Sequence, residues 1–169
     1  MKTAAYLERI NYCGTLTPSA ETLRRLHLAH LLSVPFENLS IHWRGIHWRE
    51  PIILGDEALF EKIVRRRRGG FCYELNGLFA ALLRELGFSV KMLSAEVADA
   101  EGNFGPPFDH MALLVTLEDR WLADVGFGDS FREPLLLDER APQIQDDDAF
   151  RIDPAGDRLV VMRRKDDDW

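Results

Sequence analysis

The residues of this chain that could carry covalent chemistry centre on Cys72, which follows the glycine pair Gly69 and Gly70 and begins an amphipathic segment. A thiol in the first turn of a helix lies near the positive end of the helix dipole and near unpaired backbone N–H groups, and both favour the thiolate. The glycines let a substrate approach the backbone closely, and the Cys72 N–H could stabilise the oxyanion formed on an attacked carbonyl. The pattern predicts a nucleophile that accepts acyl groups.

A buried structural role is the alternative for Cys72, since that is the more common fate of a lone cysteine. Cys13, the other cysteine, has no base or helix dipole beside it in the sequence, so we expect it to pack and not to react. A base that reaches Cys72 would decide between the two roles.

Two further residues have the types that an activated thiol needs. His110 begins an apolar run directly after a loop, a position from which a base can reach a cleft. Asp124 lies in an apolar stretch, where an unpaired carboxylate would be costly, so it requires a partner. His110 can be that partner.

Strand geometry limits how His110 and Asp124 can meet, because side chains alternate between the two faces of a strand. A two-residue turn between their strands would put them on opposite faces. A three-residue loop at 117–119 pairs His110 with Gly126 and makes Asp124 a diagonal neighbour of His110 on the same face, roughly 7–8 Å away at the backbone. A catalytic triad of Cys72, His110 and Asp124 therefore requires a hairpin with the three-residue loop.

The elements that must position these residues change character along the chain. Apolar residues with helical spacing predict helices at 17–32, capped by Thr17, at 56–66 and at 72–86. Later, short apolar runs between turn residues predict antiparallel strands at 89–97, 110–116, 120–125, 134–137 and 158–163, the last after a hairpin turn at 153–157. Helices followed by strands indicate an α+β protein, with a helical domain at 1–87 that carries the nucleophile and an antiparallel β domain at 88–169 that carries His110 and Asp124.

Composition argues against several classes of function. The chain has 28 acidic and 21 basic residues and a formal net charge of -7, so no nucleic acid partner is expected. Polar residues interrupt the N-terminal segment and no apolar run could cross a bilayer, so we expect neither a signal peptide nor a membrane partner. Two dissimilar cysteines form no disulfide framework, which indicates the cytoplasm. The run His42, Trp43, His47, Trp48 lacks metal-ligand spacing, and no metal is expected.

Four segments appear in the order and approximate spacing of arylamine N-acetyltransferases, which this chain resembles from about residue 6 to at least residue 137. They are Val34-Pro35-Phe36-Glu37-Asn38-Leu39, Arg68-Gly69-Gly70-Phe71-Cys72, His110 and Asp124-Val125-Gly126-Phe127-Gly128. The resemblance implies an N-terminal helical bundle followed by an antiparallel β-barrel-like domain. It places Cys72, His110 and Asp124 at their junction, as a triad similar to that of papain-like cysteine proteases.

The resemblance also implies roles around the triad. Contacts to the substrate or cofactor fall on Phe36, Gly126, Phe127 and Gly128. Glu37 and Arg68 match an ion pair that holds the loop of the nucleophile. The arginines at 65–67 are more simply a solvated helix face than a phosphate site for coenzyme A.

The implied reaction is ping-pong acyl transfer from acetyl-CoA to an arylamine or arylhydrazine through an acetyl-Cys72 intermediate. His110 would move the protons, and Asp124 would fix its tautomer and favour the imidazolium. Family members continue well beyond residue 169, into the rest of the barrel and a lid domain. We therefore expect a β domain that is incomplete at its C-terminus, impaired activity with acetyl-CoA, and self-association through exposed apolar surface.

Three other functions remain open. A related amide synthase, which closes a macrolactam from an acyl thioester, would use the same triad with a different acceptor pocket around Phe127 and Phe131. A cysteine hydrolase of the papain or transglutaminase type shares the same logic. From another class, the chain could be an inactive folding unit or a binding module.

Overall fold

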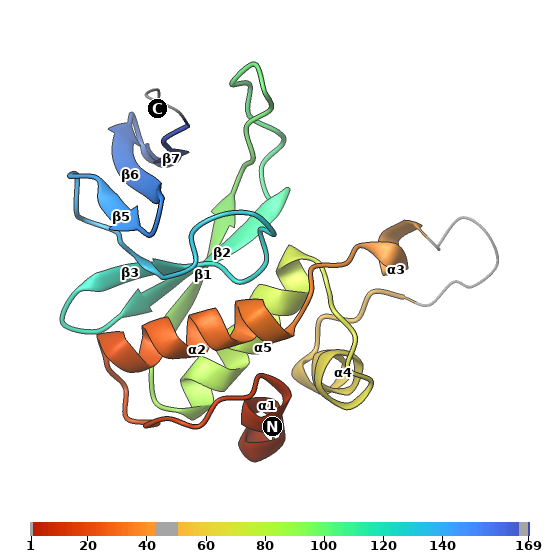
Figure 1. Ribbon diagram of the computed structural model, residues 1–169. Helices are drawn as coiled ribbons and strands as arrows, with labels where there is room; N and C mark the ends of the chain where they lie inside the picture. Colours follow the sequence, from red (N-terminus) through yellow and green to blue (C-terminus); the bar gives the residue numbers. More distant parts are fainter. Residues whose placement is uncertain (1, 43–50, 166–168) are drawn as a thin grey trace.

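The computed structural model describes residues 2–42, 51–165 and 169. Its helices are α1 (Thr3–Arg9), α2 (Ala20–Ser33), α3 (Leu39–His42), α4 (Asp56–Leu59), the π-helical η2 (Phe60–Arg65) and α5 (Cys72–Glu85). Its strands are β1 (Ser89–Ala95), β2 (His110–Thr116), β3 (Arg120–Ala123), β4 (Leu135–Leu136), β5 (Gln143–Gln145), β6 (Asp148–Ala155) and β7 (Arg158–Arg163). Helices thus precede strands, which confirms the α+β class (Figure 1).

The predicted helices are all present, with one wrong start. Helix α2 begins at Ala20 because Ser19, in extended backbone, accepts a hydrogen bond from the Thr22 N–H at 3.1 Å, so Ser19 is the cap and Thr17 is not. The helix predicted at 56–66 forms as α4 and continues as the wider η2. Helices α1 and α3 were not expected from the sequence. None of the helices in the described parts of the chain is long and apolar enough to cross a membrane.

The strands form two open antiparallel sheets, not the barrel-like closure that the resemblance implied. One sheet has the order β1-β2-β3-β4 and the other β5-β6-β7. Strands β5 and β6 were missed, and the hairpin turn predicted at 153–157 is shorter than predicted, because β6 extends to Ala155 and only residues 156 and 157 form the turn before β7. Only Phe150 and Ile152 of β6 are large apolar residues facing the core, while Arg151 and Asp153 pair with each other at 2.9 Å on the other face.

The first sheet separates two apolar clusters, because alternate residues of its strands point to opposite faces. Leu113, Val115, Trp121 and Ala123 pack with the helices in one cluster, whereas Ala112 and Leu122 pack with Phe150 and Ile152 in the other. Figure 1 shows α2 and α5 on one side of this sheet and β5 to β7 on the other. Helices and strands from the two sides of the predicted domain boundary therefore share one core. The division into domains at 1–87 and 88–169 stays a prediction.

Candidate active site

The segment that ends in Leu39 and the glycine pair form one local structure. Phe36 and Gly70 make an isolated parallel bridge, in which the Glu37 N–H donates to the Gly70 carbonyl at 2.8 Å. A Cβ on Gly69 would lie 2.0 Å from the Pro35 carbonyl oxygen, so only glycine allows this approach. Segments 34–39 and 68–72, two of the four singled out in the sequence, are thus in direct backbone contact, and the second leads the chain into α5.

Cys72 is the first residue of α5, as its sequence context predicted. The preceding Phe71 caps the helix with its backbone, because its N–H donates to the Glu74 carboxylate at 3.1 Å. Cys72 is 7% exposed, while Cys13 is exposed at the surface. The thiol is therefore at a helix N-terminus in a largely enclosed place.

His110 and Asp124 are joined by a hydrogen bond of 2.6 Å, in which His110 Nε2–H donates to Asp124 Oδ2. Strands β2 and β3 pair Thr116 with Arg120, which leaves a loop of three residues at 117–119. This is the loop length needed to place His110 and Asp124 on the same face of the sheet. Both residues are 6% exposed, so the pair lies out of bulk water.

Asp124 and Cys72 both affect the protonation of His110. Burial by itself would lower the pKa of His110, but hydrogen bonds with the Asp124 carboxylate and with Cys72 raise that pKa to about 10. The Phe127 ring meets the imidazole edge to face, with 5.3 Å between ring centroids. The structure thus brings Cys72, His110 and Asp124 together, with a hydrogen bond between His110 and Asp124 and a His110 pKa well above neutral pH.

Asn76 is a member of this arrangement that the sequence analysis did not single out. Its amide nitrogen donates to the Asp124 carboxylate at 2.8 Å and to the Met111 carbonyl at 2.7 Å, and its oxygen accepts from the Val125 N–H at 2.9 Å. The signal was available, since Asn76 lies four residues after Cys72 and so on the same face of a helix.

The loop after Asp124 packs tightly against the nucleophile. The Gly126 N–H donates to Asp124 Oδ1 at 2.9 Å, and a Cβ on Gly126 would lie 2.7 Å from Cys72 Cα. Gly128 has a φ of +102°, which glycine tolerates best. Phe36 and Phe127 are 46% and 42% exposed, so both offer aromatic surface near the triad.

A chain of ion pairs lies beneath the start of α5. Arg68 contacts the Glu37 carboxylate at 2.5 Å, as the resemblance implied. Lys62 adds a second connection, because its ammonium lies 2.7 Å from Glu74 and 3.5 Å from Glu37. Lys62 was not predicted as a site residue, because no local pattern distinguishes it from the other charged residues of its helix.

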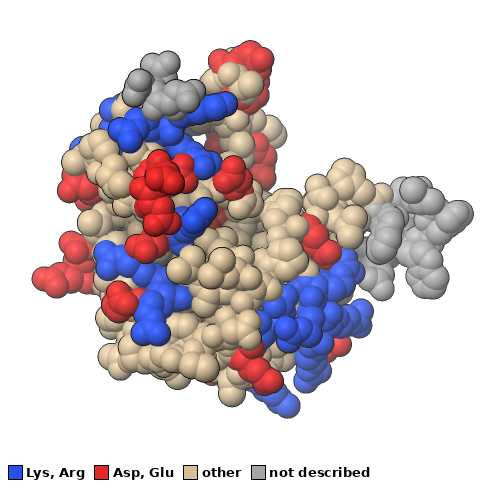
Figure 2. Space-filling view, in the orientation of Figure 1, with Lys and Arg blue, Asp and Glu red and all other residues tan. Residues whose placement is uncertain are grey.

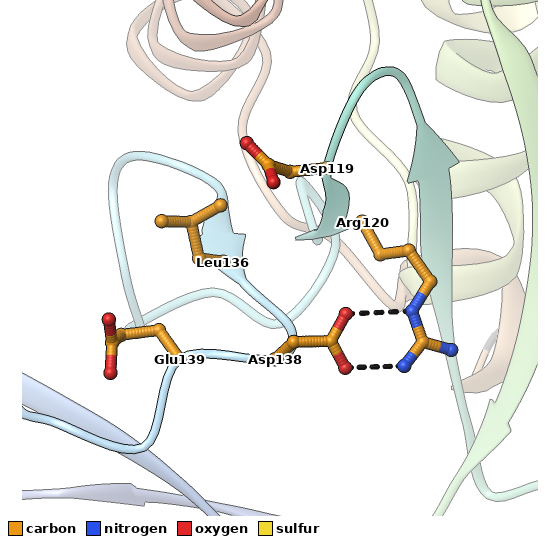
Figure 3. A pocket seen from close by; sticks show the side chains of 5 residues that line it. All are labelled: Asp119, Arg120, Leu136, Asp138 and Glu139. Atoms are coloured by element: carbon orange, nitrogen blue, oxygen red, sulfur yellow. Dashed lines mark hydrogen bonds and ion pairs between the residues drawn. The ribbon is translucent and has the colours of Figure 1, made fainter.

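Other polar features of the surface lie apart from this site. A pocket between β3 and β4 is lined by Asp119, Arg120, Leu136, Asp138 and Glu139, with a two-point ion pair between Arg120 and Asp138 (Figure 3). Basic side chains gather over the region of α4 and η2 (Figure 2). Arg65 and Arg66 there are mostly exposed and pair with Glu61, which fits a solvated helix face.

Metal ligation gains no support from side-chain clustering. Within the described residues, no group of three or more His, Cys, Asp or Glu side chains could hold a metal ion. Trp43, His47 and Trp48 lie outside the described residues.

Known proteins resemble this chain in both sequence and fold. Residues 19–169 match the protein family described as N-acetyltransferase. The chain belongs to the arylamine N-acetyltransferase family. An arylamine N-acetyltransferase / N-hydroxyarylamine O-acetyltransferase of Salmonella typhimurium is 40% identical over 167 residues, which cover 98% of this chain and 58% of that protein. The structure of Mycobacterium marinum arylamine N-acetyltransferase in complex with CoA superposes with a TM-score of 0.87 at 38% identity, covering 99% of this chain and 62% of that one.

The family also includes a protein with a different name. Proansamycin X synthase of Amycolatopsis mediterranei is 36% identical over 161 residues, which cover 94% of this chain and 61% of that protein. This chain therefore spans about three fifths of the length of the curated relatives that it matches, with 58% and 61% coverage of these two.

Proposed function

We propose that this chain carries the acyl-transfer centre of an arylamine N-acetyltransferase, which moves an acetyl group from acetyl-CoA to an arylamine or arylhydrazine. The observation that carries the proposal is the buried hydrogen bond between His110 and Asp124, on an imidazole that also interacts with Cys72 at the start of α5. A solved relative in complex with CoA supports the choice of donor. Membership of the family supports the choice of acceptor.

In the first half-reaction, the Cys72 sulfur attacks the thioester carbonyl, a new C–S bond forms, and the coenzyme A thiolate leaves. His110, protonated at rest, gives its proton to that leaving sulfur. In the second half-reaction, the neutral His110 takes a proton from the amine as its nitrogen attacks the acetyl-Cys72 carbonyl. The C–S bond breaks, the amide is released, and the thiolate–imidazolium pair is restored.

Asp124 and the aromatic residues have separate parts in this proposal. Asp124 accepts from His110 Nε2, which leaves Nδ1 to exchange protons with the sulfur and the substrates. Phe36 and Phe127 present exposed rings near the triad, and such rings would stack on an aromatic acceptor. Gly126 and Gly128 keep the neighbouring loop free of side chains that would block the donor.

A second candidate is acyl transfer to an amine within a larger thioester substrate, as an amide synthase would catalyse. The similarity to proansamycin X synthase supports this second candidate, because the chain is 36% identical to that protein and 40% identical to the Salmonella enzyme. Both candidates use the same acyl-Cys72 intermediate and differ in the acceptor.

Mass spectrometry tests the shared intermediate. We expect acetyl-CoA to place one acetyl group on the Cys72 peptide, and an added arylamine to remove it. Cys13→Ser should acetylate normally, whereas Cys72→Ser should not. A chain that stays unmodified, or that is acetylated on Cys13 instead, would contradict the proposal.

A further inference from the structure

His27 is a fully buried histidine on α2 that contacts the candidate acid from behind. The Asp124 N–H donates to His27 Nε2 at 3.1 Å, and His27 Nδ1 lies 2.7 Å from the Arg132 carbonyl oxygen. It thereby joins a helix to the end of β3 and to the loop that follows, across a separation of 97 residues in the case of Asp124.

These partners fix the state of the ring. A carbonyl oxygen can only accept, so Nδ1 must carry the hydrogen, and a backbone N–H can only donate, so Nε2 must be bare. His27 is therefore neutral in a single tautomer. Its burial, which lowers the pKa to about 4, agrees with that assignment.

The packing around His27 leaves the ring little freedom. Phe131 stacks on it with ring centroids 5.9 Å apart, and Phe79 meets it edge to face at 6.1 Å. The acceptor atom of His27 is therefore held in place by aromatic contacts on two sides.

Asp124 needs an acceptor at this point, because it comes directly after β3 ends at Ala123 and a buried N–H without a partner is costly. Asn76 and Gly126 bind its carboxylate, while His27 binds its backbone. We propose that His27 is a positioning residue, which fixes the Asp124 backbone so that the carboxylate meets the His110 imidazole. The inference rests on the proposed function for its consequence in acyl transfer.

His30 provides a matched control one turn further along α2. It is equally buried, and its Nδ1 is hydrogen-bonded to the Tyr6 hydroxyl at 2.8 Å, not to Asp124. His30→Phe therefore removes a buried polar group from the same helix without touching the acid.

The test combines NMR of the His110 Nε2–H proton with the rate at which iodoacetamide alkylates Cys72. His27→Phe keeps the aromatic packing and removes the acceptor. We expect this variant to shift or lose the His110 resonance and to slow alkylation by about tenfold to a hundredfold. His30→Phe should lower the melting temperature while keeping the resonance and the rate.

Two amide variants keep the test decisive if His27→Phe does not fold. His27→Gln places an oxygen near the position of Nε2, whereas His27→Asn offers its amide near Nδ1 only. We expect Gln to restore the resonance and most of the rate, and Asn to restore neither. An unchanged His110 resonance in His27→Phe, or equal behaviour of the two amide variants, would overturn the inference. Acetylation of Cys72 is measured separately, in the unaltered chain. If the unaltered chain is not acetylated but His27→Phe still loses the His110 resonance, the proposed function is refuted and the positioning role of His27 stands.

Discussion

Asn76 and Asp124 are hydrogen-bonded at 2.8 Å, and Asn76 lies one helical turn after Cys72 on α5. The helix that carries the sulfur therefore also carries a group that orients the acid. Because Cys72 and Asn76 lie on one helix, the hydrogen bond from Asn76 fixes the Asp124 carboxylate relative to Cys72.

Removing this amide should damage both stability and reactivity. Asn76→Ala leaves the Val125 N–H and the Met111 carbonyl without partners, and each such buried group costs about 1–3 kcal/mol. We expect urea unfolding to show that loss and alkylation of Cys72 to slow. Asn103→Ala, in an exposed loop, is the control. Wild-type alkylation in Asn76→Ala would mean that the amide does not orient Asp124.

The two cysteines allow chemistry to be separated from access. Cys13 is exposed and Cys72 is buried, so labelling by exposure alone would favour Cys13. Because only Cys72 combines a helix N-terminus with a histidine, we expect iodoacetamide at neutral pH to label Cys72 faster, by at least about tenfold. Peptide mapping over time gives both rates. Equal rates, or faster labelling of Cys13, would remove the ground for calling Cys72 a nucleophile.

Stability should depend on pH through His110. Its pKa is raised from 6.5 to about 10 by Asp124 and Cys72, against the lowering effect of burial. The protonated form is thus favoured by folding, so this contribution is complete below pH 6.5 and disappears as the pH rises through about 10. Urea unfolding at intervals between these values should show falling stability in the wild type. His110→Gln should flatten that part of the profile, and an equally steep decline in the variant would assign it to other groups.

The close approach of Gly126 to Cys72 can be tested by adding one methyl group. In Gly126→Ala the new Cβ would meet Cys72 Cα at 2.7 Å and Asn76 Nδ2 at 2.9 Å, so the loop or the helix must move. We expect a loss of about 1–3 kcal/mol in unfolding free energy and slower alkylation of Cys72. Gly55→Ala is a matched control, because a Cβ there meets nothing within 4 Å. If the two variants have the same stability and the same rate of Cys72 alkylation, the close packing of Gly126 against Cys72 does not matter for either property.

Local patterns predicted the elements that carry the triad. Periodic leucines placed α5, and parity of the strands gave the loop at 117–119, because both depend on residues close in sequence. Strand β6 escaped prediction because charged residues and a proline interrupt its alternation, while the pairing with β5 and β7 and the packing of Phe150 and Ile152 that stabilise it are tertiary contacts.

The supporting residues of the site were harder to predict than the triad. Asn76, Lys62 and His27 act through partners that lie 12 to 105 residues away in the chain. A histidine among leucines on a helix has no local feature that distinguishes an acceptor for a distant N–H from an ordinary core residue. Their roles depend on tertiary contacts, which no short motif encodes.

The shared core of helices and strands also has a kinetic consequence. Leu75, Leu78 and Phe79 of α5 belong to the same cluster as Leu113 and Val115 of β2. Packing of the β2–β3 hairpin on α5 therefore buries the core and also brings His110 and Asp124 to Cys72. It depends on contacts between distant parts of the chain, which are typically slow to form. Thiol reactivity during refolding should consequently appear only with the final, cooperative phase, so that the reactive sulfur reports completion of the fold.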